Sequence, residues 1–131
     1  MNEFRVLVID DETAILRMLA MALSRKGYHV DTADNGELGI KMLKSNQYHL
    51  VITDMQMGKI SGEDVLLQAR ELKGDNLPVI AMSGTPWLMD KNLFDAVLPK
   101  PYSLKKLFEM LQAFPLRQTI TSKAVWTLTS T

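Results

Sequence analysis

The stretch VLVIDDE, residues 6–12, decides the fold, because an apolar and mostly β-branched run stops there at three acidic residues. Runs of this length and composition are typical of a strand that is buried on both faces of a sheet. Two later runs repeat the pattern, with residues 50–52 shortly before Asp54 and residues 79–81 shortly before Ser83. The sequence therefore predicts three short buried strands, each of which ends near a polar residue.

Segments with a helical spacing of apolar residues alternate with these strands. We expect helices over residues 14–23, 36–45, 65–72 and 103–114, and further strands over residues 29–33 and 96–98. Gly27 is placed to end the first helix, and Ser103 is a natural N-cap for the last. Alternation of this kind predicts an α/β fold, a single doubly wound five-stranded parallel sheet with helices on both faces. We expect the flavodoxin-like strand order 2-1-3-4-5, with the fourth helix short or absent.

Length, charge and residue usage exclude several classes of protein. A chain of 131 residues is long enough for one domain with its own core. The absence of cysteine excludes zinc fingers and thiol catalysis and favours a reducing, cytoplasmic location. The 15 basic and 15 acidic residues balance, which argues against a nucleic-acid clamp. No apolar run is long enough to span a membrane, so we expect a soluble protein.

Polar residues follow the predicted strands at the edge of the sheet where folds of this kind bind ligands. They are Asp10, Asp11, Asp54, Ser83 and Lys100. Three carboxylates that lie close together repel one another unless a cation compensates their charge. A hard divalent ion with oxygen ligands is the natural compensator, so the set predicts Mg²⁺, and the lack of His or Cys disfavours zinc.

A carboxylate beside Mg²⁺ can act as a nucleophile toward a phosphoryl group. Phosphoryl transfer needs further positive charge and hydrogen-bond donors around the other phosphoryl oxygens. Lys100 would supply the charge and Ser83 the hydroxyl. The residues alone therefore predict phosphorylation of an aspartate.

Each of these residues also has an ordinary structural explanation. Asp10 and Asp11 could be an N-cap with first-turn acids, Asp54 a turn residue, and Ser83 a capping or turn hydroxyl. The structural explanation must hold at four strand ends at once. We therefore favour the functional one.

Four motifs together resemble the response-regulator receiver domain of two-component signalling. They are VLVIDDE at 6–12, VITDMQMGKISG at 51–62, PVIAMSG at 78–84 and LPKP at 98–101. The resemblance covers about residues 4–114, so we predict a receiver domain over residues 1–114. Residues 115–131 form a C-terminal tail that could be an extra strand, a partner-binding segment or a disordered linker.

The resemblance implies a role for each site residue. Asp54 would be the phosphoacceptor. Asp11, Asp54 and the backbone carbonyl of Gln56 would hold Mg²⁺, with Asp10 reaching the ion mainly through water. Ser83 resembles the hydroxyl that follows the phosphoryl group, and Lys100 the strand-end lysine that pairs with it. The Lys100–Pro101 peptide bond is expected to be cis.

The sequence departs from the family pattern in places that concern signal output. Val97 stands where the family usually has an aromatic residue that rotates on phosphorylation. The interval between Ser83 and Lys100 is short, and residues 87–89 could then be partly exposed and form a partner site. Gly58 replaces a usual proline, which should loosen the loop. The histidines at strand starts, His29 and His49, are expected to be ordinary surface or edge residues.

The predicted function is a phosphoacceptor receiver of a two-component phosphorelay, which takes a phosphoryl group from a histidine kinase or phosphotransfer protein and switches partner binding. We expect no enzyme activity beyond phosphorylation and dephosphorylation of Asp54 itself. The alternative is a degenerate receiver that acts as a phosphorylation-independent interaction module. A phosphatase of the haloacid-dehalogenase type is disfavoured, because Asp54 has no second acid two residues on. The downstream partner stays open, no contact with nucleic acid or membrane is expected, and the chain is expected to be a monomer or a weak homodimer.

Overall fold

The computed structural model describes residues 4–86, 93–101 and 103–113, and the chain divides into two units, residues 1–101 and 102–131, that are taken separately. The first unit holds a five-stranded sheet in the order β2-β1-β3-β4-β5. Every strand pair is parallel. The strands are β1 (Arg5–Ile9), β2 (His29–Ala33), β3 (Leu50–Asp54), β4 (Val79–Ser83) and β5 (Ala96–Pro99). The predicted sheet and its strand order are confirmed.

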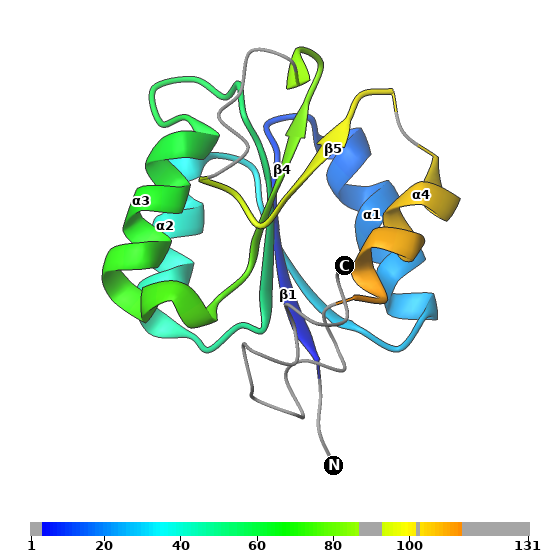
Figure 1. The fold of residues 1–131 in the computed structure, drawn as a ribbon, viewed down its shortest axis with the longest axis horizontal. Coiled ribbons are helices and arrows are strands. Elements are labelled where there is room, and N and C mark those ends of the chain that lie inside the picture. Colours follow the sequence, from blue (N-terminus) through cyan, green and yellow to red (C-terminus); the bar gives the residue numbers. More distant parts are fainter. Residues whose placement is uncertain (1–3, 87–92, 102, 114–131) are drawn as a thin grey trace. The chain divides into compact units, whose positions relative to one another are not determined.

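Helices cover both faces of this sheet, as predicted (Figure 1). The helix α1 (Thr13–Arg25) lies on one face, and α2 (Gly36–Ser45) and α3 (Gly62–Lys73) lie together on the other. A short 3₁₀ turn, Gly74–Asn76, follows α3. The second unit contributes the helix α4 (Leu104–Leu111).

Two predicted helix ends are confirmed by their local geometry. Gly27 adopts a φ of 96°, a conformation that side chains rarely tolerate, and its N–H donates to the carbonyl of Ser24 at the end of α1. The Ser103 side chain accepts a hydrogen bond of 3.1 Å from the Lys106 N–H at the start of α4. These caps fix where α1 stops and where α4 begins.

The core lies on both faces of the sheet, because the central strands alternate buried side chains between them. Val6 and Val8 are fully buried on the face of α1, which itself buries Leu16, Leu19 and Leu23. The opposite face packs against α2 and α3 through a cluster that includes Leu7, Ile9, Leu43, Val51, Val65, Leu66 and Ala69. Burial on both sides explains why the sequences of the central strands are continuous apolar runs.

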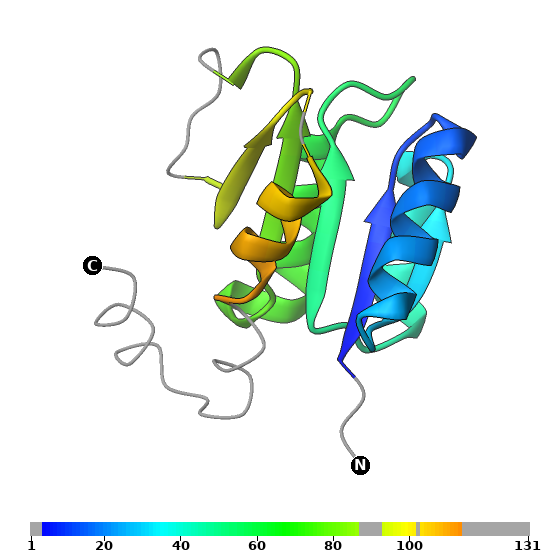
Figure 2. The same cartoon turned by 90° about the vertical axis from the view of Figure 1, so that its right-hand side faces the viewer.

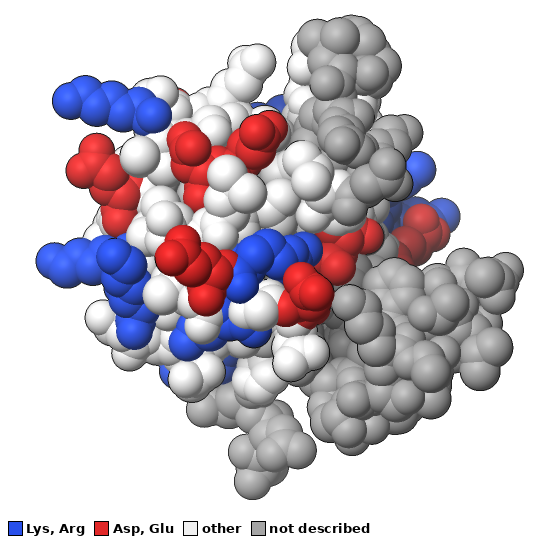
Figure 3. Space-filling model, turned by 60° about the vertical axis from the view of Figure 1, so that its left-hand side comes forward, with Lys and Arg blue, Asp and Glu red and all other residues white. Residues whose placement is uncertain are grey.

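The face formed by α2 and α3 carries interspersed charges of both signs (Figure 3). Glu63, Asp64 and Arg70 lie on α3, and Glu37 and Lys44 on α2. Among the described residues, none of the helices has the length and apolar character that a membrane span requires.

Three expectations fall wholly or partly on residues that the structure does not describe. In the described parts of the β4–β5 connection, residues 84–86 and 93–95, no α-helix is present. Residues 87–89, expected as a partner site, lie outside the described residues, as does the tail 115–131. The predictions for both segments stay predictions.

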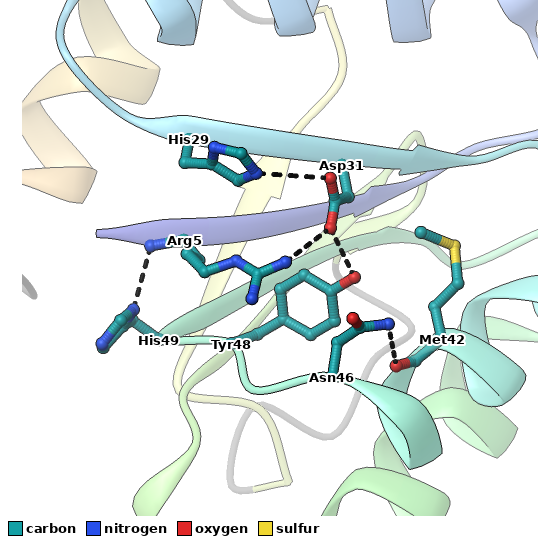
Figure 4. Close-up of polar contacts among 7 residues, drawn as sticks. All are labelled: Arg5, His29, Asp31, Met42, Asn46, Tyr48 and His49. Atoms are coloured by element: carbon teal, nitrogen blue, oxygen red, sulfur yellow. Dashed lines mark hydrogen bonds and ion pairs between the residues drawn. The ribbon is translucent and has the colours of Figure 1, made fainter. Parts of the chain in front are cut away.

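A polar cluster joins β1, β2 and the segment that leads into β3 (Figure 4). Its residues lie in or just before the amino-terminal parts of these strands, away from the carboxyl ends where the predicted site lies. The Arg5 guanidinium and the Tyr48 hydroxyl both donate to Asp31 Oδ2, at 3.2 and 2.7 Å. The backbone N–H of Arg5 donates to His49 Nδ1 at 2.9 Å, and Arg5 O accepts from the His49 N–H at 2.8 Å. We expected His49 to be an ordinary surface or edge residue, and that expectation did not include this role. The His49 ring accepts a hydrogen bond that extends the pairing between β1 and β3.

Candidate functional site

The carboxyl ends of the parallel strands meet at one edge of the sheet (Figure 2). Asp10 follows β1 directly, Asp11 comes next, and Asp54 is the last residue of β3. One oxygen from each of these carboxylates lies within 4.8 Å of the other two. Asp10 is fully buried, Asp54 is 6% exposed, and Asp11 is exposed. The structure thus brings together the three acids that the sequence singled out.

Asp10 does not cap the following helix through the usual contact. The N-cap of α1 is Glu12, whose side chain makes no capping hydrogen bond. Asp10 Oδ1 instead accepts from the Glu12 N–H at 2.9 Å, while its Oδ2 is buried without a partner among the described residues. Burial, together with the negative charge of Asp54, raises the pKa of Asp10 to about 6, although the Glu12 N–H and Lys100 pull the other way.

Asp54 is held by two donors on the same oxygen. Lys100 Nζ lies 2.9 Å from Asp54 Oδ1, and the Met55 N–H donates to that atom at 3.0 Å. Burial works to lower the pKa of Lys100, but the hydrogen bond to Asp54 and the charges of the acids around it outweigh burial and raise it. Lys100 is therefore a cation at neutral pH, placed against the predicted phosphoacceptor.

Ser83 lies at the end of β4 and is almost fully buried. Its Oγ accepts from the Thr85 N–H at 3.0 Å, so in this state the hydroxyl closes a local turn. Its carbonyl accepts from the Lys100 N–H at 2.8 Å, which joins the ends of β4 and β5. Ser83 and Lys100 are therefore neighbours, while the predicted switching role of Ser83 stays a prediction.

The remaining predicted positions lie around this set. The Lys100–Pro101 peptide bond is cis, as expected. Gln56, whose carbonyl was expected to bind the metal, is exposed in the loop after β3. Val97 lies in β5 opposite Ala81, half-buried against the core.

The donor set fits a hard divalent cation. All three side chains offer carboxylate oxygens, the ligands that Mg²⁺ prefers. A buried carboxylate oxygen without a partner, such as Asp10 Oδ2, is costly unless something compensates it. A cation between Asp10, Asp11 and Asp54 would remove that cost.

One residue at the site was not singled out from the sequence. Gly62 opens α3, and its N–H donates to the carbonyl of Met55 at 3.1 Å. Two signals in the sequence could have found it: Gly62 follows a serine that can act as an N-cap, and it closes the motif VITDMQMGKISG at 51–62. Only the structure places Gly62 against the backbone of Asp54 and Met55.

Comparison with known proteins gives a consistent result. The sequence model of the family described as "Response regulator receiver domain" matches residues 6–112. A probable transcriptional regulatory protein of Picosynechococcus sp. is 32% identical over 126 residues, which cover 87% of this chain and 50% of that protein. The response regulator MprA of Mycolicibacterium vanbaalenii is 30% identical over 120 residues, which cover 88% of this chain and 52% of that protein. The chain thus spans about half the length of the curated relatives it matches.

Solved structures of response regulators are also similar to this chain. The response regulator TrrA of Thermotoga maritima, solved in complex with Mg(2+)-BeF, is 33% identical and superposes with a TM-score of 0.76. The match covers 84% of this chain and 97% of that one. The likeness therefore extends over nearly the whole of that structure.

Proposed function

Because the chain belongs to the response regulator receiver domain family of two-component systems, we propose that Asp54 accepts a phosphoryl group from a histidine kinase or phosphotransfer protein. The observation that carries this proposal is the contact of Lys100 Nζ with Asp54 Oδ1 at 2.9 Å, beside two further acids. Carboxylate, cation and acidic cluster come from the ends of different strands. Because they meet at one place, we favour a site for phosphoryl transfer and not an ion pair that only stabilises the fold.

In the proposed reaction, a carboxylate oxygen of Asp54 attacks the phosphorus of a phosphohistidine. An O–P bond forms, the N–P bond of the donor breaks, and the imidazole leaves with the electron pair of that bond. The donors on Oδ1, Lys100 Nζ and the Met55 N–H, restrict the rotation of the carboxylate and so hold the nucleophile ready.

The acids around Asp54 would hold the metal that such a transfer requires. Asp10, Asp11 and Asp54, with the carbonyl of Gln56, would bind Mg²⁺, which supplies positive charge to the transferred phosphoryl group. The relative from Thermotoga maritima was solved with Mg²⁺, and this supports the choice of metal. Lys100, which directly follows β5, supplies a second positive charge.

Phosphorylation then changes what surrounds Lys100 and Ser83. The phosphoryl group places new negative charge and acceptor oxygens beside the Lys100 ammonium. The Ser83 hydroxyl now closes a turn with Thr85, and the Ser83 carbonyl accepts from the Lys100 N–H, so Ser83 can respond together with Lys100. A shift of this turn would alter the adjoining surface and so the affinity for a partner.

The protein is proposed as a phosphoacceptor that acts in the cytoplasm, not as an enzyme that turns over other substrates. Its reactions would be limited to phosphorylation and dephosphorylation of Asp54. The match to the receiver-domain family supports the role of phosphoacceptor.

The intact mass of the chain after incubation with acetyl phosphate tests the proposal. We expect one phosphoryl adduct that requires Mg²⁺ and is absent from Asp54→Asn. An adduct that persists in Asp54→Asn would refute the assignment of the acceptor. No adduct from acetyl phosphate or from a panel of phosphorylated histidine kinases would favour a phosphorylation-independent module.

A further inference from the structure

Gly62 occupies a position that has no room for a side chain. A Cβ there would lie 2.5 Å from the carbonyl oxygen of Asp54, 2.9 Å from Met55 Cα and 2.9 Å from Met55 Sδ. The glycines with positive φ in the described chain are Gly27 and Gly74, so backbone conformation is not what requires glycine at 62. The requirement is space, and two of the three nearest atoms belong to the main chain of the phosphoacceptor and its neighbour.

The helix that carries Gly62 cannot easily move away. Ser61 and Asp64 form a capping box, in which the Ser61 N–H donates to Asp64 Oδ2 at 2.9 Å and the Asp64 N–H donates to Ser61 Oγ at 3.2 Å. Val65 and Ala69 of the same helix are fully buried against the sheet. Because α3 is held in this way, part of the strain from an added methyl group would fall on the Asp54–Met55 peptide.

That peptide carries the donor that orients the carboxylate of Asp54. The Met55 N–H bonds both to Asp54 Oδ1 at 3.0 Å and to the carbonyl of Met82 at 3.1 Å. On its other side, the Met55 carbonyl accepts from the Gly62 N–H at 3.1 Å. A displacement of this peptide would move the N–H away from Asp54 Oδ1.

We propose that Gly62 is a positioning residue for Asp54, a role that rests on the proposed function of Asp54 as phosphoacceptor. By letting the start of α3 close onto the Asp54–Met55 peptide, it fixes the direction of the Met55 N–H. That N–H in turn fixes the carboxylate that attacks the phosphoryl group. Gly62 acts only through Met55 and touches no reacting atom.

The test compares Gly62→Ala with Gly58→Ala. Gly58 lies in the loop that leads from β3 to α3, and a Cβ built there meets nothing within 4 Å, so this variant is a matched control. The first measurement is the rate constant for phosphorylation by acetyl phosphate at saturating Mg²⁺, with the phosphorylatable fraction determined separately. A loss of stability alone would lower that fraction, whereas a displaced nucleophile lowers the rate constant.

We expect the rate constant of Gly62→Ala to fall at least about tenfold, since small misplacements of reacting groups have effects of this size. That of Gly58→Ala should stay within about twofold of the wild type, because its methyl group meets open space. A Gly62→Ala rate constant equal to that of Gly58→Ala would overturn the positioning role while leaving the proposed function intact.

The second measurement does not depend on phosphorylation. Amide hydrogen exchange at Met55 should accelerate at least about tenfold in Gly62→Ala, because its hydrogen bonds are disturbed, and stay unchanged in Gly58→Ala. Unchanged exchange at Met55 would overturn the proposal. If exchange responds but the wild type forms no adduct with any donor, the proposed function fails, and the control of the Met55 amide by Gly62 is still supported.

Should Gly62→Ala not fold, Ser61→Ala loosens the same helix start without adding an atom. We expect exchange at Met55 to rise about fivefold in this variant, the size of effect typical of a lost N-cap. The matched control is Asn35→Ala, which removes the cap of α2 by deleting the acceptor of the Leu38 N–H. Equal Met55 exchange in the two variants would refute the proposal.

Discussion

Lys100 contacts two strand ends at once: its Nζ donates to Asp54 Oδ1 at 2.9 Å, and its backbone N–H donates to the carbonyl of Ser83 at 2.8 Å. The first contact joins β5 to the end of β3, and the second joins it to the end of β4. A change of charge on Asp54 therefore acts directly on Lys100, whose backbone N–H is also bonded to Ser83.

Lys100→Ala should separate metal binding from phosphoryl transfer. We expect Mg²⁺ affinity to be equal or higher, because a cation near the acidic cluster is lost, as measured by calorimetric titration. The phosphorylation rate should fall at least about tenfold, because positive charge at the phosphoryl oxygens is lost. Lys59→Ala removes an exposed lysine from the loop after Asp54 and should leave both quantities unchanged. A normal phosphorylation rate in Lys100→Ala would contradict the role of Lys100.

Asp10→Asn should stabilise the metal-free protein at neutral pH. The pKa of Asp10 is about 6 in the fold against 3.8 as the ordinary value, so the folded state binds the proton more tightly than the unfolded one. Stability therefore falls as the pH rises from about 4 to about 6, and above that range the cost stays constant. A pKa shift of this size lowers the free energy of unfolding by about 3 kcal/mol at pH 7.5. The neutral amide of asparagine would remove this loss.

Urea unfolding in EDTA at pH 7.5 and pH 4 tests this expectation. The gain in Asp10→Asn should be present at pH 7.5 and absent at pH 4, where the wild-type carboxyl is already protonated in the fold. The exposed Glu71→Gln serves as a control for the loss of one negative charge and should show little gain at either pH. A stabilisation of equal size at both pH values would refute the electrostatic explanation.

Much of this architecture could be predicted from the sequence, because the central strands are buried on both faces and their residues are therefore uniformly apolar. Runs such as residues 6–9 end at polar residues, and parallel strands bring such ends to one edge. The meeting of Asp10, Asp54 and Lys100 thus follows from topology once the strand order is known.

Contacts that depend on side-chain direction or on available space could not be predicted in the same way. The sequence does not reveal that the His49 ring accepts from the Arg5 N–H, because a histidine at a strand start more often points to solvent. It also does not reveal that Gly62 lies against Asp54, because that contact depends on how closely α3 approaches β3. Ser83 is a third case, since its hydroxyl closes a local turn in this state.

His49→Asn should weaken the acid sensitivity of the fold. The ring nitrogen Nδ1 accepts from the Arg5 N–H and must be unprotonated to do so. Burial and the charge of Arg5 lower the pKa of His49. The unfolded chain therefore takes up a proton first as the pH falls through 6.5, and stability is lost from there downward.

Asparagine offers an acceptor oxygen near the position of Nδ1 but does not titrate. We expect the His49→Asn variant to lose less stability than the wild type between pH 7.5 and pH 5.5 in urea unfolding. At pH 7.5 the histidine is neutral, so a comparison there isolates the change in packing against Phe4, whose ring stacks on His49 at 5.1 Å. An identical pH dependence of the two proteins would exclude His49 as the source.

Tyr48→Phe should destabilise β2, the outer strand of the sheet next to β1. The Tyr48 hydroxyl donates to Asp31 Oδ2 at 2.7 Å, and burial together with this bond raises the pKa of Tyr48, so the hydroxyl stays a donor. Without the Tyr48 hydroxyl, Arg5 is the remaining donor to Asp31 Oδ2. We expect the free energy of unfolding to fall by about 1–2 kcal/mol. Urea unfolding at pH 7.5 measures this cost, with Tyr28→Phe as the control, since it removes the hydroxyl of a half-buried tyrosine. An equal effect of the two variants would mean that the contact with Asp31 does not stabilise β2.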